Sequence, residues 1–182
     1  MAMAVSPLAV PLPELPPLGV RKVGFEIVGP APRKAGQTNV ELVLREPATP
    51  RRTLDRLSLD LRVRQPEQTQ KRTFVSEIDG SVQYYAVNPS SKPSMSNSLV
   101  LSTHGASVEA ISQAQAYANK DWATIVAPTN RRPFGFDWED WGRLDAMEVL
   151  GEAGKRFPHD PRRTVLTGHS MGGHGAWHLS TT

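Results

Sequence analysis

One stretch near the end of the sequence constrains the fold more than any other. Residues 164–167 are β-branched or apolar and predict a buried strand, and a Gly-x-Ser-x-Gly pattern centred on Ser170 follows directly. In this pattern the serine occupies a sharp, strained turn between a strand and a helix, with its hydroxyl exposed above the sheet. Gly168 and Gly172 leave the turn the room that it needs, because they carry no side chains. The stretch therefore predicts a strand, a strained turn at Ser170 and a helix.

The composition of the 182 residues excludes several classes of protein. The formal net charge is +3, and the arginine pairs at 51–52, 131–132 and 162–163 are scattered and not interleaved with aromatic residues. We therefore expect them to be solvated surface, with no nucleic-acid partner. The chain has no cysteine, which excludes disulfides and thiolate metal sites. No apolar run is long enough to span a bilayer, so no membrane partner is expected, while compartment and oligomeric state stay open.

The N-terminal part of the sequence predicts β-structure without catalytic residues. Residues 1–19 are rich in proline and no Lys or Arg precedes their apolar part, so they predict an extended, partly disordered arm and not a signal peptide. Alternating apolar and polar residues at 23–27, 40–44 and 57–63 predict antiparallel strands with one solvated face. The turn residues expected between them are Gly29, Pro30, Gly36, Pro47 and Pro50.

The sequence after this module predicts an α/β domain. The expected division is a proline-rich arm at 1–19, a small β-rich accessory module at 20–65, a linker at 66–72 and the α/β domain at 73–182. Asp79-Gly80 between two alternating runs predicts a β-hairpin, so Asp79 is a turn residue and not a catalytic acid. The strands expected next are 98–103, 123–127 and 164–167, with helices at 108–119 (N-cap Ser107) and 141–157. This alternation predicts a mostly parallel sheet covered on both faces.

The turn after the strand at 98–103 is a candidate for half of an oxyanion hole. His104 and Gly105 follow the strand, and a glycine allows a backbone N–H to face a substrate oxygen without steric obstruction. In a fold with this kind of serine turn, the second oxyanion donor comes from such a loop. We therefore expect the backbone N–H groups of Met171 and Ala106 to bind an oxyanion. The residues expected to support the two turns are His104, Gly105, Gly168 and Gly172.

The sequence offers no base for Ser170. A serine hydroxyl is a weak nucleophile and needs a base within hydrogen-bonding reach, oriented by a third group. In this fold an acid and then a histidine follow the serine along the chain, but no acid follows Ser170 here. His174 and His178 lie on the helix that leaves the turn, and His169 points elsewhere. We expect His104 to shape its loop and not to accept the proton.

Two other features have competing interpretations. His174 and His178 have the i, i+4 spacing of zinc-binding helices, but Gly175 replaces the glutamate of that motif, so we expect no metal and no cofactor. The loop at 129–140 follows a strand and carries the aromatic residues Phe134, Phe136 and Trp138. Loops at the carboxyl ends of strands carry function, so these rings either line a substrate cleft or pack as a lid.

Residues 160–179, together with residues 138–145, resemble the prolyl oligopeptidase family and its esterase relatives within the α/β hydrolases. The similarity covers residues 72–182 and is most specific around the serine turn. The resemblance implies a partial α/β-hydrolase three-layer sandwich with Ser170 as nucleophile. It also implies an acid and a histidine in strands outside this sequence, which makes the chain the N-terminal half of a catalytic domain.

Two functional hypotheses follow. The first is a serine hydrolase, either a peptidase or a carboxylesterase, that cleaves a peptide or ester substrate through an acyl-enzyme, here as a fragment that is inactive alone. The second is a non-catalytic binding or assembly module derived from an α/β hydrolase, which pairs through its open sheet edge. Both predict that the strand at 164–167 is an edge strand, and a bare apolar edge favours aggregation.

Overall fold

The computed structural model of the chain contains two compact units. The described residues are 4–6, 9–28, 34–46, 48–49, 52–132, 135 and 137–182. One unit comprises Met1–Gln65 and the other Pro66–Thr182. The turn residues expected at Gly29, Pro30, Pro47 and Pro50, and the loop residues Phe134 and Phe136, lie outside the described residues.

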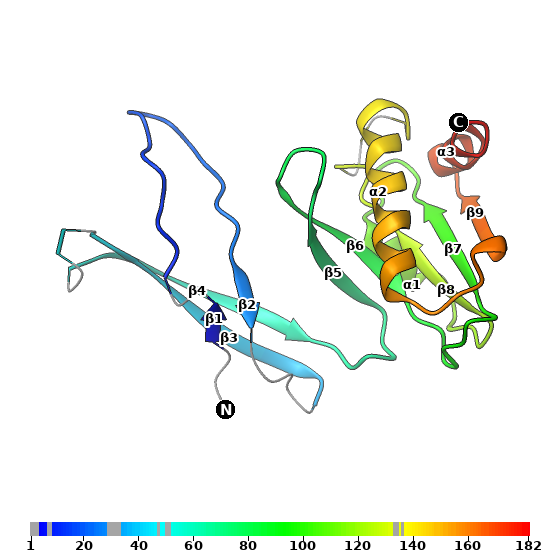
Figure 1. Cartoon of the computed structure of the whole chain (residues 1–182), viewed down its shortest axis with the longest axis horizontal. Helices are drawn as coiled ribbons and strands as arrows, with labels where there is room; N and C mark the ends of the chain where they lie inside the picture. The colour runs from blue at the N-terminus through cyan, green and yellow to red at the C-terminus, as the bar shows by residue number, and fades with distance from the viewer. Residues whose placement is uncertain are drawn as a thin grey trace. The chain divides into compact units, whose positions relative to one another are not determined.

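The first unit is built from pairs of antiparallel strands (Figure 1). The pairs are β1 (Ala4–Ser6) with β2 (Glu26–Val28) and β3 (Gly36–Arg45) with β4 (Thr53–Val63). β1 lies inside the stretch expected to be an extended, partly disordered arm, and its pairing with β2 was not part of that expectation. Alternation identifies residues that can form a strand, but the backbone groups of a strand also need a partner, which the pattern does not identify.

The β3–β4 ribbon keeps the alternation that predicts it. Val40 lies opposite Leu59 and Leu42 lies opposite Leu57, so apolar residues of the two strands meet on one face. The register of the ribbon is therefore the one that brings its apolar side chains together.

The second unit contains a five-stranded sheet with the order β5-β6-β8-β7-β9 (Figure 1). The strands are β5 (Gln70–Val75), β6 (Val82–Asn88), β7 (Ser98–Thr103), β8 (Ala123–Ala127) and β9 (Thr164–Gly168). β6 runs antiparallel to β5 and β8, whereas β7 runs parallel to β8 and β9. All strands except β6 therefore share one direction. Within this sheet β9 pairs only with β7, so it is an edge strand, as the sequence predicts.

Helices cover both faces of this sheet. They are α1 (Ala110–Gln115), α2 (Asp140–Arg156) and α3 (Met171–Ser180). Because side chains alternate along a strand, Ala86 packs against α1 on one face, and its neighbours Tyr85 and Val87 join the main core on the other. The buried residues of that core are Phe74, Tyr85, Val87, Leu99, Leu101, Val126, Trp138, Ala146, Val149, Ala153 and Leu179. The predicted architecture, a mostly parallel sheet with helices on both faces and a small antiparallel module before it in the sequence, is confirmed.

Some boundaries differ from those predicted. β5 begins at Gln70, inside the stretch expected to be a linker, because its pairing with β6 extends that far. α1 is shorter than the predicted helix, and its N-cap is Glu109 and not Ser107. Ser107 has a positive φ of 65°, and the N–H of Val108 donates to the Gly105 carbonyl at 3.2 Å. The chain therefore makes an extra turn before the helix begins.

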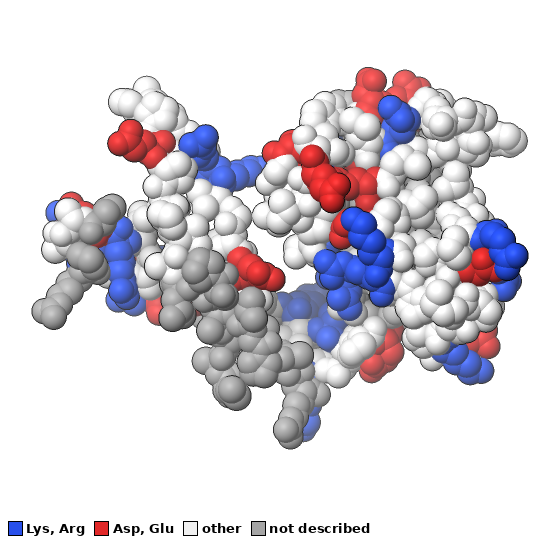
Figure 2. Space-filling model, viewed as in Figure 1, with Lys and Arg blue, Asp and Glu red and all other residues white. Residues whose placement is uncertain are grey.

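Acidic and basic side chains are interspersed on the face of the molecule in Figure 2. Arg131 departs from the prediction that the arginine pairs are solvated, because its side chain is only 9% exposed. Burial is tolerated there because three carboxylates, those of Asp79, Asp145 and Glu148, lie within 3.4 Å of its guanidinium. In the described parts of the chain, no helix is both long enough and apolar enough to cross a bilayer.

Candidate active site

Ser170 lies in the turn between β9 and α3, and its backbone is strained. Its φ is 56° and its ψ is −123°, a combination that residues other than glycine seldom adopt. Such a conformation costs about 1–3 kcal/mol and persists only where the surrounding structure enforces it. Ser170 is exposed, and Met171 directly after it begins α3. The turn therefore holds the hydroxyl at the surface, beside the N-terminus of a helix.

Two glycines allow this turn to form by close backbone contact. A Cβ atom added to Gly168 would collide with the carbonyl group of Gly172, and one added to Gly172 would collide with the carbonyl group of Thr103. Neither glycine has a positive φ in the structure, so the requirement is steric and not conformational. The first turn of α3 therefore packs directly on the ends of β9 and β7.

The second predicted turn lies beside the first. β7 and β9 are adjacent and parallel, so the turns that follow them emerge at the same edge of the sheet. A Cβ added to Gly105 would lie 3.3 Å from the Cβ of Ser170 and 3.3 Å from the carbonyl oxygen of His169. Gly105 is buried, and Ala106 after it is exposed. The structure thus brings together the two backbone segments that the sequence nominates as oxyanion donors.

His104 is fully buried under this turn. Its Nδ1 lies 2.9 Å from the Gly105 carbonyl oxygen and its Nε2 lies 3.1 Å from the Thr129 carbonyl oxygen. A neutral imidazole has a single N–H, so it donates to one of these oxygens at a time. Because its ring nitrogens face the carbonyl oxygens of Gly105 and Thr129, the imidazole is directed at its own turn and at the loop after β8, and not at Ser170.

His174 and His178 have contacts of their own, whereas the Nδ1 of His169 would lie 3.6 Å from a Cβ added to Gly105, so the His169 side chain lies beside the His104 turn. On α3, the Nε2 of His174 lies 3.1 Å from a carboxylate oxygen of Glu139, and its ring stacks on that of His178 at 6.1 Å between centroids. No group of three or more His, Asp or Glu side chains suited to a metal ion occurs among the residues that the structure describes.

For the ring of Trp138 the sequence left two interpretations open, the lining of a substrate cleft or a packed lid. The side chain is fully buried, so it packs inside the domain and does not line a cleft. Its ring contacts the His104 imidazole edge to face, with 4.8 Å between centroids. A Cβ added to Gly175 of α3 would collide with this indole. Trp138 therefore fills the space between the His104 turn and the helix that follows Ser170.

A buried ion pair supports the start of the same loop. The Asp145 carboxylate accepts hydrogen bonds from the backbone N–H of Thr129 at 3.0 Å and from its hydroxyl at 3.2 Å. The Nε of Arg131 lies 3.1 Å from the other carboxylate oxygen. Burial raises the pKa of Asp145 above its ordinary value of 3.8, and this effect outweighs the lowering by Arg131 and by the hydrogen bonds from Thr129.

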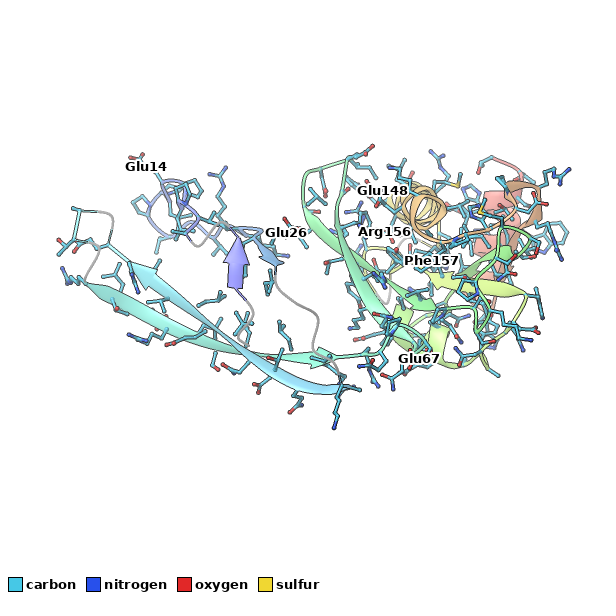
Figure 3. The ribbon with its side chains drawn as sticks, turned by 60° about the horizontal axis from the view of Figure 1, so that its bottom comes forward. Glu14, Glu26, Glu67, Glu148, Arg156 and Phe157 are labelled. Atoms are coloured by element: carbon cyan, nitrogen blue, oxygen red, sulfur yellow. The ribbon has the colours of Figure 1, made fainter. Side chains whose placement is uncertain are left out.

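Glu148 joins this ion pair to the β5–β6 hairpin. It projects from α2 and is labelled in Figure 3. Its carboxylate accepts from the hydroxyl of Ser76 at 2.9 Å and from the backbone N–H of Glu77 at 2.6 Å, and pairs with Arg131 at 3.1 Å. The hairpin, α2 and the loop after β8 are thereby linked through Arg131.

Thr129 and Asp145 contact the site region, but sequence reasoning did not nominate them, and for Trp138 it gave a cleft or a lid and no contact with the His104 turn. Trp138 and Asp145 belong to the segment quoted for the family resemblance, which was the one available signal. The resemblance identifies a segment but does not assign a role to its residues. Their contacts with distant parts of the chain cannot be predicted from local sequence spacing.

Fold and site together define an α/β sandwich with a strained serine turn at the carboxyl end of its sheet. No protein-family model matches the sequence, and neither does any curated protein. A thermostable esterase is similar in structure, with 16% identity and a TM-score of 0.47 over 76% of this chain and 45% of that protein. An S-formylglutathione hydrolase from Agrobacterium tumefaciens has 18% identity and a TM-score of 0.47 over 62% of this chain and 52% of its own. The enzyme of that name from Staphylococcus aureus has 18% identity and a TM-score of 0.46, over 59% and 49%. The chain thus spans about half the length of each of these proteins.

Proposed function

We propose that this chain carries the nucleophile and the oxyanion donors of a serine hydrolase that cleaves ester or peptide bonds through an acyl-enzyme. The observation that carries the proposal is the strained, exposed turn at Ser170, which stands beside the backbone of Gly105. A strained residue at a turn is maintained against its cost by the packing around it. Here that packing presents a hydroxyl group beside a helix N-terminus.

The oxyanion donors in this proposal are the backbone N–H groups of Met171 and Ala106. Met171 begins α3, and the first N–H groups of a helix have no acceptor within the helix. The partial positive charge at the same helix end favours an oxyanion. Ala106 is exposed and follows Gly105, whose added Cβ would lie 3.3 Å from the Ser170 Cβ, which supports an Ala106 N–H that faces Ser170. Removing one such donor typically costs a hundred- to a thousandfold in rate, roughly.

The proposed reaction has two steps. The Ser170 oxygen forms a bond to the substrate carbonyl carbon while its proton passes to a base, and the bond to the leaving alcohol or amine breaks as that group takes up a proton. Water then attacks the acyl-enzyme and releases the acid and the free serine. Both ring nitrogens of His104 face carbonyl oxygens, and His174 is paired with Glu139. We therefore propose that these 182 residues, tested alone, perform the first step slowly.

A fluorophosphonate probe tests the proposal, because it forms a stable bond to an activated serine. The expected result is slow labelling of the 182-residue chain that peptide mass spectrometry maps to Ser170 and that Ser170→Ala abolishes. Ser180→Ala is the matched control, since Ser180 lies at the exposed end of the same helix. Labelling spread equally over several serines, or no adduct on Ser170, would overturn the proposal. Rapid stoichiometric labelling would support the nucleophile but contradict the expected lack of a base.

A further inference from the structure

Trp138 makes a hydrogen bond that fixes one peptide plane of the His104 turn. Its indole N–H donates to the carbonyl oxygen of His104 at 3.0 Å, and the indole is fully buried. The carbonyl of His104 and the N–H of Gly105 belong to the same planar peptide group. Holding that carbonyl therefore sets the direction of the Gly105 N–H as well.

The next peptide group, formed by the Gly105 carbonyl and the Ala106 N–H, has contacts of its own. The carbonyl oxygen of Gly105 accepts from the N–H of Val108 at 3.2 Å, and it lies 2.9 Å from the Nδ1 of His104. This carbonyl shares its plane with the N–H of Ala106. Two consecutive peptide groups, which end at the proposed oxyanion donor, are thus fixed in orientation by hydrogen bonds to their carbonyl oxygens.

Both ends of one loop hold His104 in place. The carbonyl oxygen of Thr129, at the start of the loop, lies 3.1 Å from the His104 Nε2, and the N–H and hydroxyl of Thr129 donate to Asp145. Trp138, at the other end, bonds to the His104 carbonyl. A turn held through its side chain and its main chain has little freedom to rotate.

The loop itself is strained, which indicates that its contacts determine its conformation. Positive φ angles occur at Asn130 (56°), Arg131 (60°), Asp137 (49°) and Trp138 (67°). Residues other than glycine keep such angles only where the surroundings over-determine them. The ion pairs of Arg131 with Asp145 and Glu148 are contacts of this kind.

We propose that Trp138 is a positioning residue, supported by Thr129, which orients the Ala106 N–H toward the oxyanion that forms on Ser170. This inference rests on the proposed function. Trp138 also packs on Gly175 of α3, so a single side chain touches the helix that carries one donor and the turn that carries the other. Its role is to set the spacing between the Met171 and Ala106 amides.

The test uses the complete chain and Trp138→Phe, which keeps an aromatic ring and removes the N–H donor. Trp122→Phe is the matched control, because Trp122 is 51% exposed. In Trp138→Phe we expect the hydrogen exchange of the Val108 amide, which donates to the Gly105 carbonyl oxygen, to accelerate by about tenfold or more when followed by NMR, because the turn that presents the Gly105 and Ala106 amides is no longer fixed. The rate constant of fluorophosphonate labelling at Ser170 should fall by about tenfold or more, approaching the loss of one oxyanion donor. The control should change neither quantity.

Hydrogen exchange in the turn tests the inference, and labelling of Ser170 tests the proposed function, so the failure of one can be told from the failure of the other. If the wild-type chain is never labelled at Ser170, the proposed function fails, and faster exchange confined to the turn still supports the positioning of these amides by Trp138. Unchanged exchange at the Val108 amide, whose acceptor is the Gly105 carbonyl oxygen, overturns the inference. Exchange that accelerates equally throughout β7 and β8 also overturns it, because that pattern belongs to a residue that only fills the core.

A wild-type measurement covers the case in which Trp138→Phe does not fold. When Ser170 carries the phosphonate, whose oxygen occupies the place of the oxyanion, the NMR signals of the Ala106 amide and of the Trp138 indole N–H should shift together. The indole signal of Trp122 should stay in place. A shift of the Met171 amide alone, with Ala106 and Trp138 unmoved, overturns the inference.

Discussion

The hydroxyl group of Thr103 donates to the carbonyl oxygen of Gly172 at 2.6 Å, although 69 residues separate the two. The same hydroxyl lies 3.1 Å from the carbonyl oxygen of Thr167. In the opposite direction, the N–H of His169 donates to the Thr103 carbonyl at 3.3 Å. The end of β7 is therefore bonded to both sides of the turn that contains Ser170, and this contact holds the two proposed oxyanion segments side by side.

Replacing Thr103 with valine should destabilise the second unit. Valine keeps the shape of threonine but leaves the buried carbonyl of Gly172 without its donor, which costs about 1–3 kcal/mol. Urea denaturation of Thr103→Val should show this loss in the free energy of unfolding. Thr103→Ser is the matched control, because it keeps the hydroxyl group. Equal stability of the valine variant and the wild type would show that the hydroxyl contributes nothing to the junction.

Adding a single methyl group at Gly172 should destabilise the protein, whereas adding one at Gly151 should not. In Gly172→Ala the new Cβ would collide with the Thr103 carbonyl group, so the backbone must shift at a cost of about 1–3 kcal/mol or more. Gly151→Ala is the matched control, because a Cβ there has no atom within 4 Å and lies in the interior of α2. That variant should be stabilised by about 0.5–1 kcal/mol through helix propensity. Thermal unfolding of both variants checks the contrast, and a Gly172→Ala protein as stable as the wild type would contradict the close packing.

The two aspartates beside Arg131, Asp145 and Asp79, should contribute to the free energy of unfolding with opposite dependences on pH. Burial raises the pKa of Asp145 above 3.8, so its contribution to stability is fully present below about pH 3.8 and is lost as pH rises through the raised value. The free energy of unfolding of wild type minus that of Asp145→Asn should therefore fall as pH rises. Hydrogen bonds from Ser81 lower the pKa of Asp79, so the same difference for Asp79→Asn should be present at neutral pH and shrink on acidification.

Denaturant titrations of the wild type, Asp145→Asn and Asp79→Asn at several pH values measure both differences. The subtraction removes the titration of all groups that the proteins share. Two differences with the same sign of slope would contradict the assignment of burial as the dominant effect on Asp145.

Local patterns predicted much of the second unit. β7 and β8 have the bounds that the sequence predicts, because apolar runs between turn residues leave few alternatives to a buried strand. The sharp bend at Ser170 was predicted because the glycine spacing has a steric meaning at each position.

The support of the site was not predicted, because it depends on contacts between distant residues. Trp138 lies among charged residues in a loop, and that pattern is the same whether the ring lines a cleft or fills a core. The bond from its indole to His104 spans 34 residues. The burial of Arg131 was not predicted either, because it also depends on contacts with distant residues. An arginine in a charged loop becomes buried only when the fold surrounds it with carboxylates.

The exposed edge of the sheet at β9 should govern self-association. Val165 is 44% exposed on this edge, and β9 contains no charged residue, whereas the opposite edge strand β5 contains Lys71 and Arg72. Charged side chains on an edge strand oppose pairing with another chain. Val165→Lys should therefore reduce light scattering during incubation at fixed concentration, and Val75→Lys on β5, where Val75 is 66% exposed, should change it less. Scattering equal to the wild type in both variants would mean that neither edge of this sheet directs association, and the apolar face of the β3–β4 ribbon would then be the surface to change.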